Sequence, residues 1–299
     1  MTRRRPVDWV DAFAARPFAG NACAVVHDAG DLPADDRLAL VRETSLSECA
    51  YVVPSDRADF GARYYLATRE IPMAGHPTVA TVVSLVHRGL VDISAGPAAF
   101  TLEVGAGVLP IEASRDAEGR VRVRMVQRRP DYGAEQDPAE VAGVFGLAAA
   151  DVAHTPRIVS TGTPFCIAPL ASADALRRAR LDPARLAAWR EGTGVEGAAL
   201  MEPFLTVAAG APGCDWFSRL LLPPPLPPED PFTGSATGCL GAYLSVEGLI
   251  PAGRFTAGQG DWLGRPGRAE VEVLGPPSAP EGIAVSGTGV VLMSGDLLL

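Results

Sequence analysis

The sequence contains no lysine, and all 26 of its basic residues are arginine. Lysine is the residue that forms a Schiff base with pyridoxal phosphate or with a carbonyl substrate. It is also the residue that reaches the terminal phosphates in a nucleotide-binding P-loop. The absence of lysine therefore excludes both kinds of chemistry.

Other signatures are missing as well. No Gly-x-Gly-x-x-Gly sequence follows the first expected strand, so we expect no dinucleotide-binding domain. The five cysteines include no Cys-x-x-Cys pair, and the four histidines are scattered, so the spacing predicts no metal site. Most cysteines lie in apolar surroundings, where a thiol usually behaves as a small hydrophobic group.

The formal net charge is −9, and no basic run extends beyond Arg3 to Arg5, which argues against nucleic-acid binding. No stretch approaches the roughly 20 apolar residues of a membrane span. Asp8 and Asp11 interrupt the pattern of a signal peptide, so we expect a cytoplasmic protein. With 299 residues and 47% hydrophobic content, the chain is expected to form two domains.

Two segments of the chain echo one another. Ala74 to Thr78 is repeated in type by Thr233 to Thr237, 159 positions later, and an apolar stretch follows each copy. Upstream, Gly20 to Val26 is similar to Gly162 to Ala168. We infer a duplicated unit in which each half ends in a buried helix opened by glycine. Because the N-terminus of a helix attracts anions, we expect the two helix ends to hold a carboxylated substrate.

Strand patterns outnumber helical ones and do not alternate with them regularly. This predicts an α+β fold of two barrel-like sheets, each around one helix. Between Leu220 and Pro231, six prolines in 12 residues predict a loop without regular structure, and Val271 to Leu298 is expected to form strands around glycine turns. The other expected strands are 6–13, 22–27, 50–54, 60–66, 100–103, 108–112 and 121–127, and the expected helices are 31–45, 77–88, 137–145, 172–180 and 182–191.

Glu48 is the first candidate for catalysis. Most of its neighbours in the sequence are apolar, so its carboxylate is expected to be partly desolvated and its pKa raised, as a proton-transferring group requires. The alternative is an ordinary surface glutamate between a helix and a strand. The residues alone leave both interpretations open.

Three further candidates lie beside the two glycine-opened helices. His76 begins the first helix, whose positive end favours a neutral imidazole. Its alternative is a helix-capping or core histidine. Asp230 and Ser235 lie on either side of Gly234 and are expected to place a carboxylate and a hydroxyl at one helix end. Turn formation and N-capping are the alternatives for this pair.

At these positions the chain resembles the phenazine-biosynthesis-like (PhzF-like) isomerase family, and the matching motifs occur in the family's order along nearly the whole chain. The segments that carry the resemblance are 7–13, 16–21, 47–48, 74–77, 230–236, 264–266 and 294–297.

The resemblance implies the fold of diaminopimelate epimerase, with two pseudo-symmetric halves and an active site in the cleft between them. The halves are expected to comprise residues 1–115 with the C-terminal strand 287–299, and residues 116–286. It also implies a homodimer that needs no cofactor. Glu48 would move the proton, His76 and Asp230 would act with it, and the substrate would be bound by Asn21, Gly75, Gly234 and Ser235.

Related epimerases and proline racemases carry catalytic cysteines at the two helix openings. Here the matching positions are Ala74 and Thr233, which disfavours racemisation by two thiols. We therefore predict an isomerase that shifts a proton and a double bond in a small unsaturated carboxylate or amino acid, in specialised-metabolite biosynthesis. The alternatives are an epimerase or racemase with a carboxylate base, and a non-catalytic protein that binds a small acid.

Overall fold

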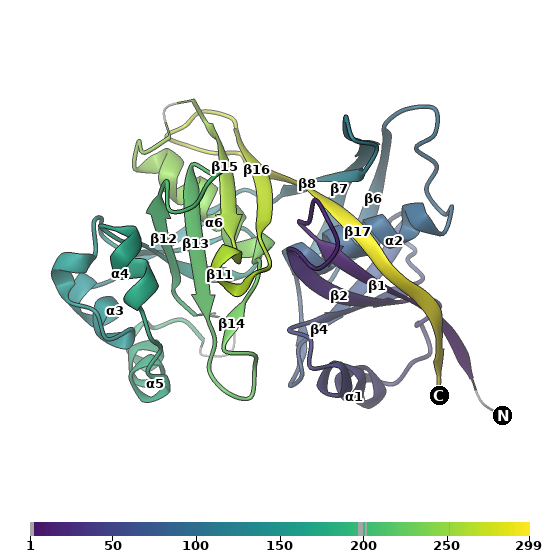
Figure 1. The fold of residues 1–299 in the computed structure, drawn as a ribbon, viewed down its shortest axis with the longest axis horizontal. Helices are drawn as coiled ribbons and strands as arrows, with labels where there is room; N and C mark the ends of the chain where they lie inside the picture. The colour runs from purple at the N-terminus through teal and green to yellow at the C-terminus, as the bar shows by residue number, and fades with distance from the viewer. Residues whose placement is uncertain (1–2, 197–199, 201, 251) are drawn as a thin grey trace. The chain divides into compact units, whose positions relative to one another are not determined.

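The computed structural model describes residues 3–196, 200, 202–250 and 252–299, and the chain divides into two compact units (Figure 1). Unit 1 comprises Met1–Val126, Gly264–Ala269 and Ser286–Leu299. Unit 2 comprises Gln127–Leu263 and Glu270–Val285. The sequence predicted a division after residue 115, whereas contacts group the chain up to Val126 with unit 1, and residues 121–125 pair antiparallel with residues 111–115.

The elements divide between the two units as follows. Unit 1 holds most or all of β1 (Arg4–Ala12), β2 (Asn21–Val26), α1 (Ala34–Thr44), β3 (Cys49–Val53), β4 (Phe60–Tyr65), β5 (Glu70–Ile71), α2 (Gly75–His87), β6 (Ala98–Val104), β7 (Gly107–Arg115), β8 (Val121–Gln127) and β17 (Gly282–Leu298). Unit 2 holds most or all of β9 (Asp131–Glu135), α3 (Pro138–Val144), η1 (Ala149–Asp151), β10 (Arg157–Ser160), β11 (Pro164–Pro169), α4 (Ala173–Arg178), α5 (Pro183–Gly192), β12 (Phe204–Ala208), β13 (Trp216–Leu221), β14 (Glu229–Asp230), α6 (Gly234–Val246), β15 (Arg254–Gln259), η2 (Asp261–Leu263) and β16 (Gly267–Leu274).

The same order of strand pairing occurs in both units. In unit 1, β1 and β2 are antiparallel, β2 and β3 parallel, β3 and β4 antiparallel, and β4 and β6 parallel. In unit 2, the pairs β10/β11, β11/β12, β12/β13 and β13/β15 have the same senses in the same order. The short strands β5 and β14 also correspond, since each pairs antiparallel with the strand before it. The echo in the sequence thus extends to a duplicated topology.

One buried helix lies against the sheet in each unit. Every residue is buried from Gly75 to Leu85 in α2 and from Gly234 to Ser245 in α6. Helix α2 packs against β1, β2 and β3, and α6 packs against β10 and β11 (Figure 1). A helix that is apolar all round needs such complete enclosure. The α+β fold and the two glycine-opened helices are confirmed.

The opposite faces of the sheets are covered differently in the two units. In unit 1, α1 covers a cluster that includes Tyr51 and Tyr65. In unit 2, α3, α4 and α5 cover a larger cluster that includes Trp189. The expected Asp-Pro helix starts are confirmed, because Asp137 and Asp182 accept hydrogen bonds from the first turns of α3 and α5.

Two expectations about regular structure are wrong. The proline-rich segment is not all loop, because its two ends pair as β13 and β14, with Leu220 opposite Asp230. Its prolines between these ends lie in the connection, where no ladder donor is needed. The expectation for the tail is wrong only after residue 282, because Gly275, with φ 84°, does lie in the connection between the strands β16 and β17, but the tail then forms one long strand, β17, without glycine turns. Its glycines allow close packing instead, since a Cβ at Gly287 would lie 2.3 Å from the Phe13 ring.

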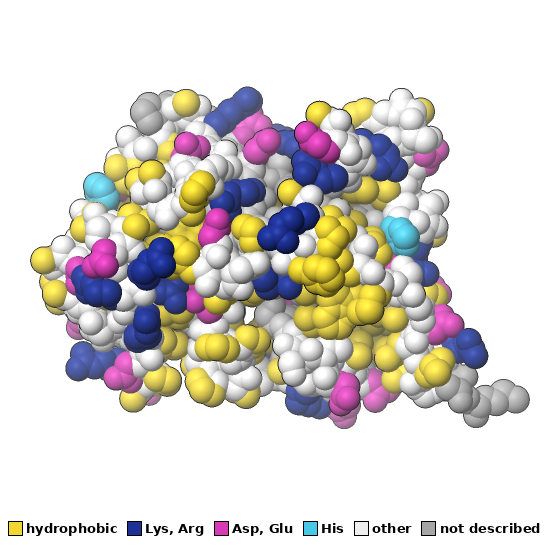
Figure 2. Space-filling view, in the orientation of Figure 1, with side chains coloured by type: hydrophobic (Ala, Val, Ile, Leu, Met, Phe, Trp, Pro, Cys, Tyr) yellow, Lys and Arg dark blue, Asp and Glu magenta, His cyan; other side chains and the backbone are white. Residues whose placement is uncertain are grey.

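The surface agrees with the overall composition. Arginine and acidic side chains are scattered over the visible face and form no single basic area there (Figure 2). Among the residues that the structure describes, no helix combines the length and the apolar character needed to cross a membrane.

The start of α6 depends on a glycine one turn into the helix. A Cβ at Gly238 would lie 1.9 Å from Oε1 of Gln127. The Gln127 side chain is buried, donates to Gly234 O at 3.0 Å and accepts from the Thr161 hydroxyl at 2.5 Å. We expect Gly238→Ala to displace it and to lower the free energy of unfolding by about 1–3 kcal/mol, as measured by urea denaturation.

The matched control is Gly192→Ala at the end of α5, where an added Cβ meets nothing within 4 Å. That variant is expected to be as stable as the wild type or slightly more so, because alanine restricts the unfolded chain. Equal stability of the two variants would show that the Gln127 side chain can move aside without lowering the free energy of unfolding.

Candidate functional site

Glu48 lies between the end of α1 and the start of β3. The chain leaves α1 through Ser45, which has a left-handed backbone with φ 53°, and then turns toward the buried strand. The Glu48 side chain is 15% exposed. The structure therefore places this carboxylate largely inside the protein and not on an open helix–strand junction, as the alternative interpretation assumed.

His76 is the second residue of α2 and is only 2% exposed. Burial lowers the pKa of its imidazole from 6.5 to about 3, so the ring is neutral at physiological pH. The sequence attributed the neutral form to the helix end, but the cause in the structure is desolvation. A neutral imidazole has one donor nitrogen and one acceptor nitrogen.

Asn21 and Glu48 both approach the same ring nitrogen of His76. The Nδ2 atom of Asn21 lies 3.1 Å from His76 Nδ1, within hydrogen-bond distance. The nearest oxygen of Glu48 is 3.9 Å from Nδ1, which is too long for a hydrogen bond, and a neutral ring forms no ion pair. His76 Nε2 is buried and has no hydrogen-bond partner among the described residues. Three predicted site residues of unit 1 are thus brought together, and one ring nitrogen remains available.

The backbone before Asn21 is held by a segment far along the chain. Gly20 N–H donates to Pro266 O at 3.2 Å, and the Arg265 guanidinium donates to Gly20 O at 2.9 Å and to the Asp11 carboxylate at 2.6 Å. Gly20 has φ 55°, and a Cβ there would lie 2.1 Å from Ala12 O. Sequence reasoning noted 264–266 only as part of the resemblance and missed this supporting role.

In unit 2, Asp230 lies just before α6 and is 4% exposed. The Thr233 hydroxyl donates to Asp230 Oδ2 at 2.6 Å. Gln259 holds the same turn, since its amide donates to Asp230 O at 2.7 Å and accepts from Thr233 N–H at 2.9 Å. Gln259 was not predicted, because a glutamine at the end of a strand carries no signal of its partner.

Both buried helices begin without a side-chain cap. The first N–H groups of a helix have no acceptor within the helix, and Gly75, Gly234 and Ser235 lie in these first turns. Ser235 is 7% exposed and belongs to the buried start of α6. In α2 the third residue is Pro77, which has no N–H. Each helix start thus offers a small number of backbone donors to an anion.

The thiols are poorly suited to proton transfer. Burial raises the pKa of Cys239 to about 11 and that of Cys49 to about 12, and it also raises the pKa of Cys23 and Cys166. These side chains therefore remain protonated at neutral pH. The N-cap positions of the two helices are occupied by Ala74 and Thr233, so neither N-cap carries a thiol.

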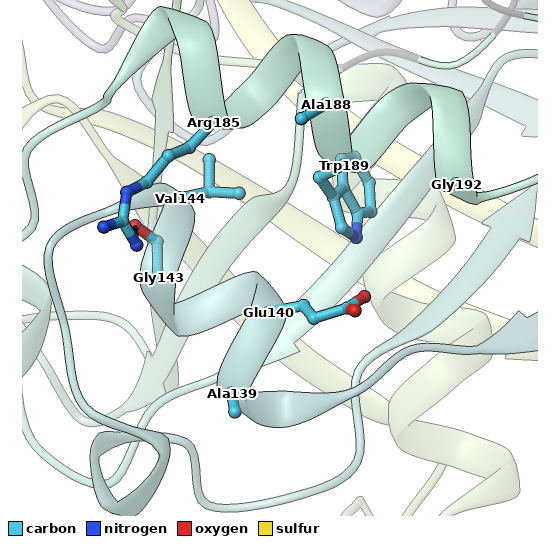
Figure 3. A pocket seen from close by; sticks show the side chains of 8 residues that line it. All are labelled: Ala139, Glu140, Gly143, Val144, Arg185, Ala188, Trp189 and Gly192. Carbon is cyan, nitrogen blue, oxygen red and sulfur yellow. Dashed lines mark hydrogen bonds between the residues drawn. The ribbon is translucent and has the colours of Figure 1, made fainter.

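A cavity of about 290 Å³ lies between α3 and α5. None of the predicted site residues lines it (Figure 3). It belongs to the helical layer of unit 2. The lining residues are Ala139, Glu140, Gly143, Val144, Arg185, Ala188, Trp189 and Gly192.

In the described part of the chain, no group of three or more His, Cys, Asp or Glu side chains is arranged to hold a metal ion.

Residues 10–295 match the model of the phenazine biosynthesis-like protein family. The chain is 31% identical to trans-2,3-dihydro-3-hydroxyanthranilate isomerase of Pseudomonas fluorescens, over 97% of this chain and 98% of that protein.

Two solved structures show the same fold. A predicted epimerase from Pseudomonas aeruginosa superposes with a TM-score of 0.82 and 30% identity, covering 98% of this chain and 99% of its own. A hydroxyproline epimerase from Agrobacterium vitis superposes with a TM-score of 0.66 and 13% identity, covering 99% of this chain and 92% of its own. The latter likeness concerns the fold alone.

The buried His76 makes stability depend on pH. An unfolded histidine titrates near 6.5 and the folded one near 3, so between these values the unfolded state binds a proton that the folded state does not. Stability is therefore expected to fall as the pH is lowered below 6.5. Between pH 7 and pH 5, His76→Gln should remove about 2 kcal/mol of the loss in unfolding free energy seen for the wild type.

Urea denaturation at the two pH values measures this difference. Burial also lowers the pKa of His27, so the wild type and the variant should share a second, common pH dependence. If both proteins lose the same free energy on acidification, His76 is not held in its neutral form by burial.

Proposed function

The chain belongs to the phenazine biosynthesis-like family and is an isomerase, and we propose that it shifts a proton, and with it a double bond, within a small unsaturated carboxylate or amino acid. The reaction would use no cofactor and would belong to specialised-metabolite biosynthesis. The observation that carries the proposal is the Glu48 carboxylate, largely buried and 3.9 Å from a neutral, buried histidine. A carboxylate in such surroundings can accept a proton from carbon and return it.

The proposed reaction has two proton transfers. The Glu48 carboxylate takes a proton from one substrate carbon, and the electron pair left behind spreads through the double bond toward an electron-withdrawing group. Glu48, now a carboxylic acid, returns a proton to a different carbon. No atoms are gained or lost, the double bond moves, and the Glu48 carboxylate is restored.

The negative charge that develops on the substrate needs stabilisation. We propose that fixed N–H groups at the start of a buried helix provide it, and in unit 1, which also holds Glu48, this is the start of α2 around Gly75. Fixed donors directed at a developing charge commonly supply the largest part of catalysis. His76 would position the substrate in unit 1, and in unit 2 the turn around Asp230 is held by Gln259.

Two other functions are compatible with the same residues. An epimerase with a carboxylate base would return the proton to the same carbon from the other face. A non-catalytic protein would bind a small acid and leave it unchanged. The occupation of both helix N-caps by Ala74 and Thr233 favours the isomerase over a two-thiol epimerase.

Incubation with candidate substrates in heavy water separates these functions. Trans-2,3-dihydro-3-hydroxyanthranilate, the compound in the name of the Pseudomonas fluorescens relative, is the first to test. An isomerase yields a shifted double bond, with deuterium at the new position when the proton on Glu48 exchanges with solvent before it is returned. An epimerase yields deuterium and inverted configuration without a shift, and a binding protein yields neither.

Glu48→Gln is expected to lower kcat by about 10²–10⁴-fold, because the amide cannot accept the proton. Glu43→Gln, on the exposed face of α1, removes the same charge nearby and is expected to retain activity. Product formation and deuterium incorporation are measured by NMR for both variants. Full activity of Glu48→Gln would refute the assignment of Glu48 as the base.

We also propose that the protein is a homodimer. Unit 1 exposes large apolar side chains, Phe18 at 69% and Met293 at 60%, of the kind that association often covers. Light scattering after size exclusion is expected to give twice the chain mass of 31.1 kDa. A mass equal to that of one chain would contradict the dimer.

A further inference from the structure

The environment of His76 determines which of its two ring nitrogens carries the proton. The Asn21 amide nitrogen lies 3.1 Å from Nδ1, and an amide N–H is a donor. With the amide nitrogen of Asn21 facing the ring, Nδ1 is the acceptor. Because burial keeps the ring neutral, the single ring proton lies on Nε2. The tautomer of His76 is thus set by one neighbouring side chain.

We propose that Asn21 is a positioning residue that holds His76 in the Nε2–H tautomer, so that His76 offers a hydrogen-bond donor to the substrate. This inference rests on the proposed function and changes the role predicted for Asn21, from contacting substrate to orienting the group that does. The substrate atom that meets His76 must then be an acceptor, such as a carboxylate or carbonyl oxygen, and not an ammonium group.

The surroundings of His76 Nε2 are the second argument that a ligand binds at this position. The His76 residue is only 2% exposed. Its Nε2 atom has no hydrogen-bond partner among the described residues. Buried polar groups in native proteins are nearly always paired, so an unpaired donor beside the proposed base calls for a partner from outside the chain. An acceptor oxygen of the substrate is such a partner.

Several contacts fix the position of Asn21. Its side chain projects from the first residue of β2, where its backbone pairs with Ala12 in the sheet. The backbone of the preceding Gly20 is hydrogen-bonded at both polar atoms: its N–H donates to Pro266 O, and its C=O accepts from the Arg265 guanidinium. Arg265 is in turn held by the fully buried Asp11. These contacts restrict the direction from which the Asn21 amide can approach His76.

Glu48 cannot replace Asn21 in this role. Its oxygen is 3.9 Å from Nδ1 and would, as an acceptor, draw the proton to Nδ1. The Asn21 amide occupies that nitrogen instead. At 3.9 Å Glu48 makes no hydrogen bond to Nδ1, and His76 keeps its proton on the other side of the ring.

The test uses the whole protein with ¹⁵N-labelled histidine, which gives four rings to follow. His76 is assigned from the spectrum of His76→Gln. In the wild type, long-range ¹H–¹⁵N spectra are expected to show the proton on Nε2 of His76 and none on Nδ1. In Asn21→Asp, the carboxylate accepts from the ring, and the proton is expected on Nδ1.

The same variants are assayed for turnover. Loss of a donor to a developing charge is expected to lower kcat of Asn21→Asp on the order of 10²-fold, with a smaller change in KM. Gln136→Glu makes the same amide-to-carboxylate change in unit 2 and is expected to alter neither the His76 spectrum nor kcat.

The outcomes separate this inference from the proposed function. A wild-type His76 with its proton on Nδ1, or an unchanged tautomer in Asn21→Asp, overturns the positioning role, whatever the reaction. A changed tautomer with unchanged turnover overturns the donor role of His76. Failure of the isomerase assay, or full activity of Glu48→Gln, overturns the proposed function and leaves the tautomer measurement valid.

Discussion

The structure depends on the complete burial of two helices, α2 and α6. A helix buried on all sides must begin inside the protein, and its first N–H groups then lack both water and an intrahelical acceptor. Both helices begin with glycine and without a side-chain cap. The same constraint that builds each core therefore leaves backbone donors at the start of one helix in each unit.

The two units meet this constraint with different side chains. In α2 the first turn carries His76, kept neutral by burial and contacted by Asn21. At α6 the Thr233 hydroxyl is directed to Asp230, and Gln259 closes the turn. A duplicated backbone has thus been given one end with an imidazole and another with a carboxylate. This asymmetry suits a reaction in which a single group, Glu48, takes and returns the proton.

Much of the fold was accessible from the sequence, because its signals are local. The repeated glycine at 75 and 234 marked both helix starts, and the Asp-Pro pairs marked α3 and α5. In strands such as β8, the alternation of side chains along the sequence indicated a strand. The long strand β17 was misjudged because its glycines resemble turn signals, although Gly287 is there to admit the Phe13 ring. The hairpin ends β13 and β14 were missed because pairing across a connection depends on distant residues.

With the help of the family resemblance, the sequence predicted the set Glu48, His76 and Asp230. By itself, it determined the chemical inventory: no lysine, no metal-ligand spacing and a duplicated helix start. Composition and short-range spacing suffice for these conclusions. Only the tertiary structure decided what each group can do. The burial that lowers the pKa of His76, the contact of Asn21 with its ring, and the hydrogen bond from Arg265 to Gly20 all join residues far apart in the chain. Desolvation and hydrogen-bond direction arise only when packing brings such residues together.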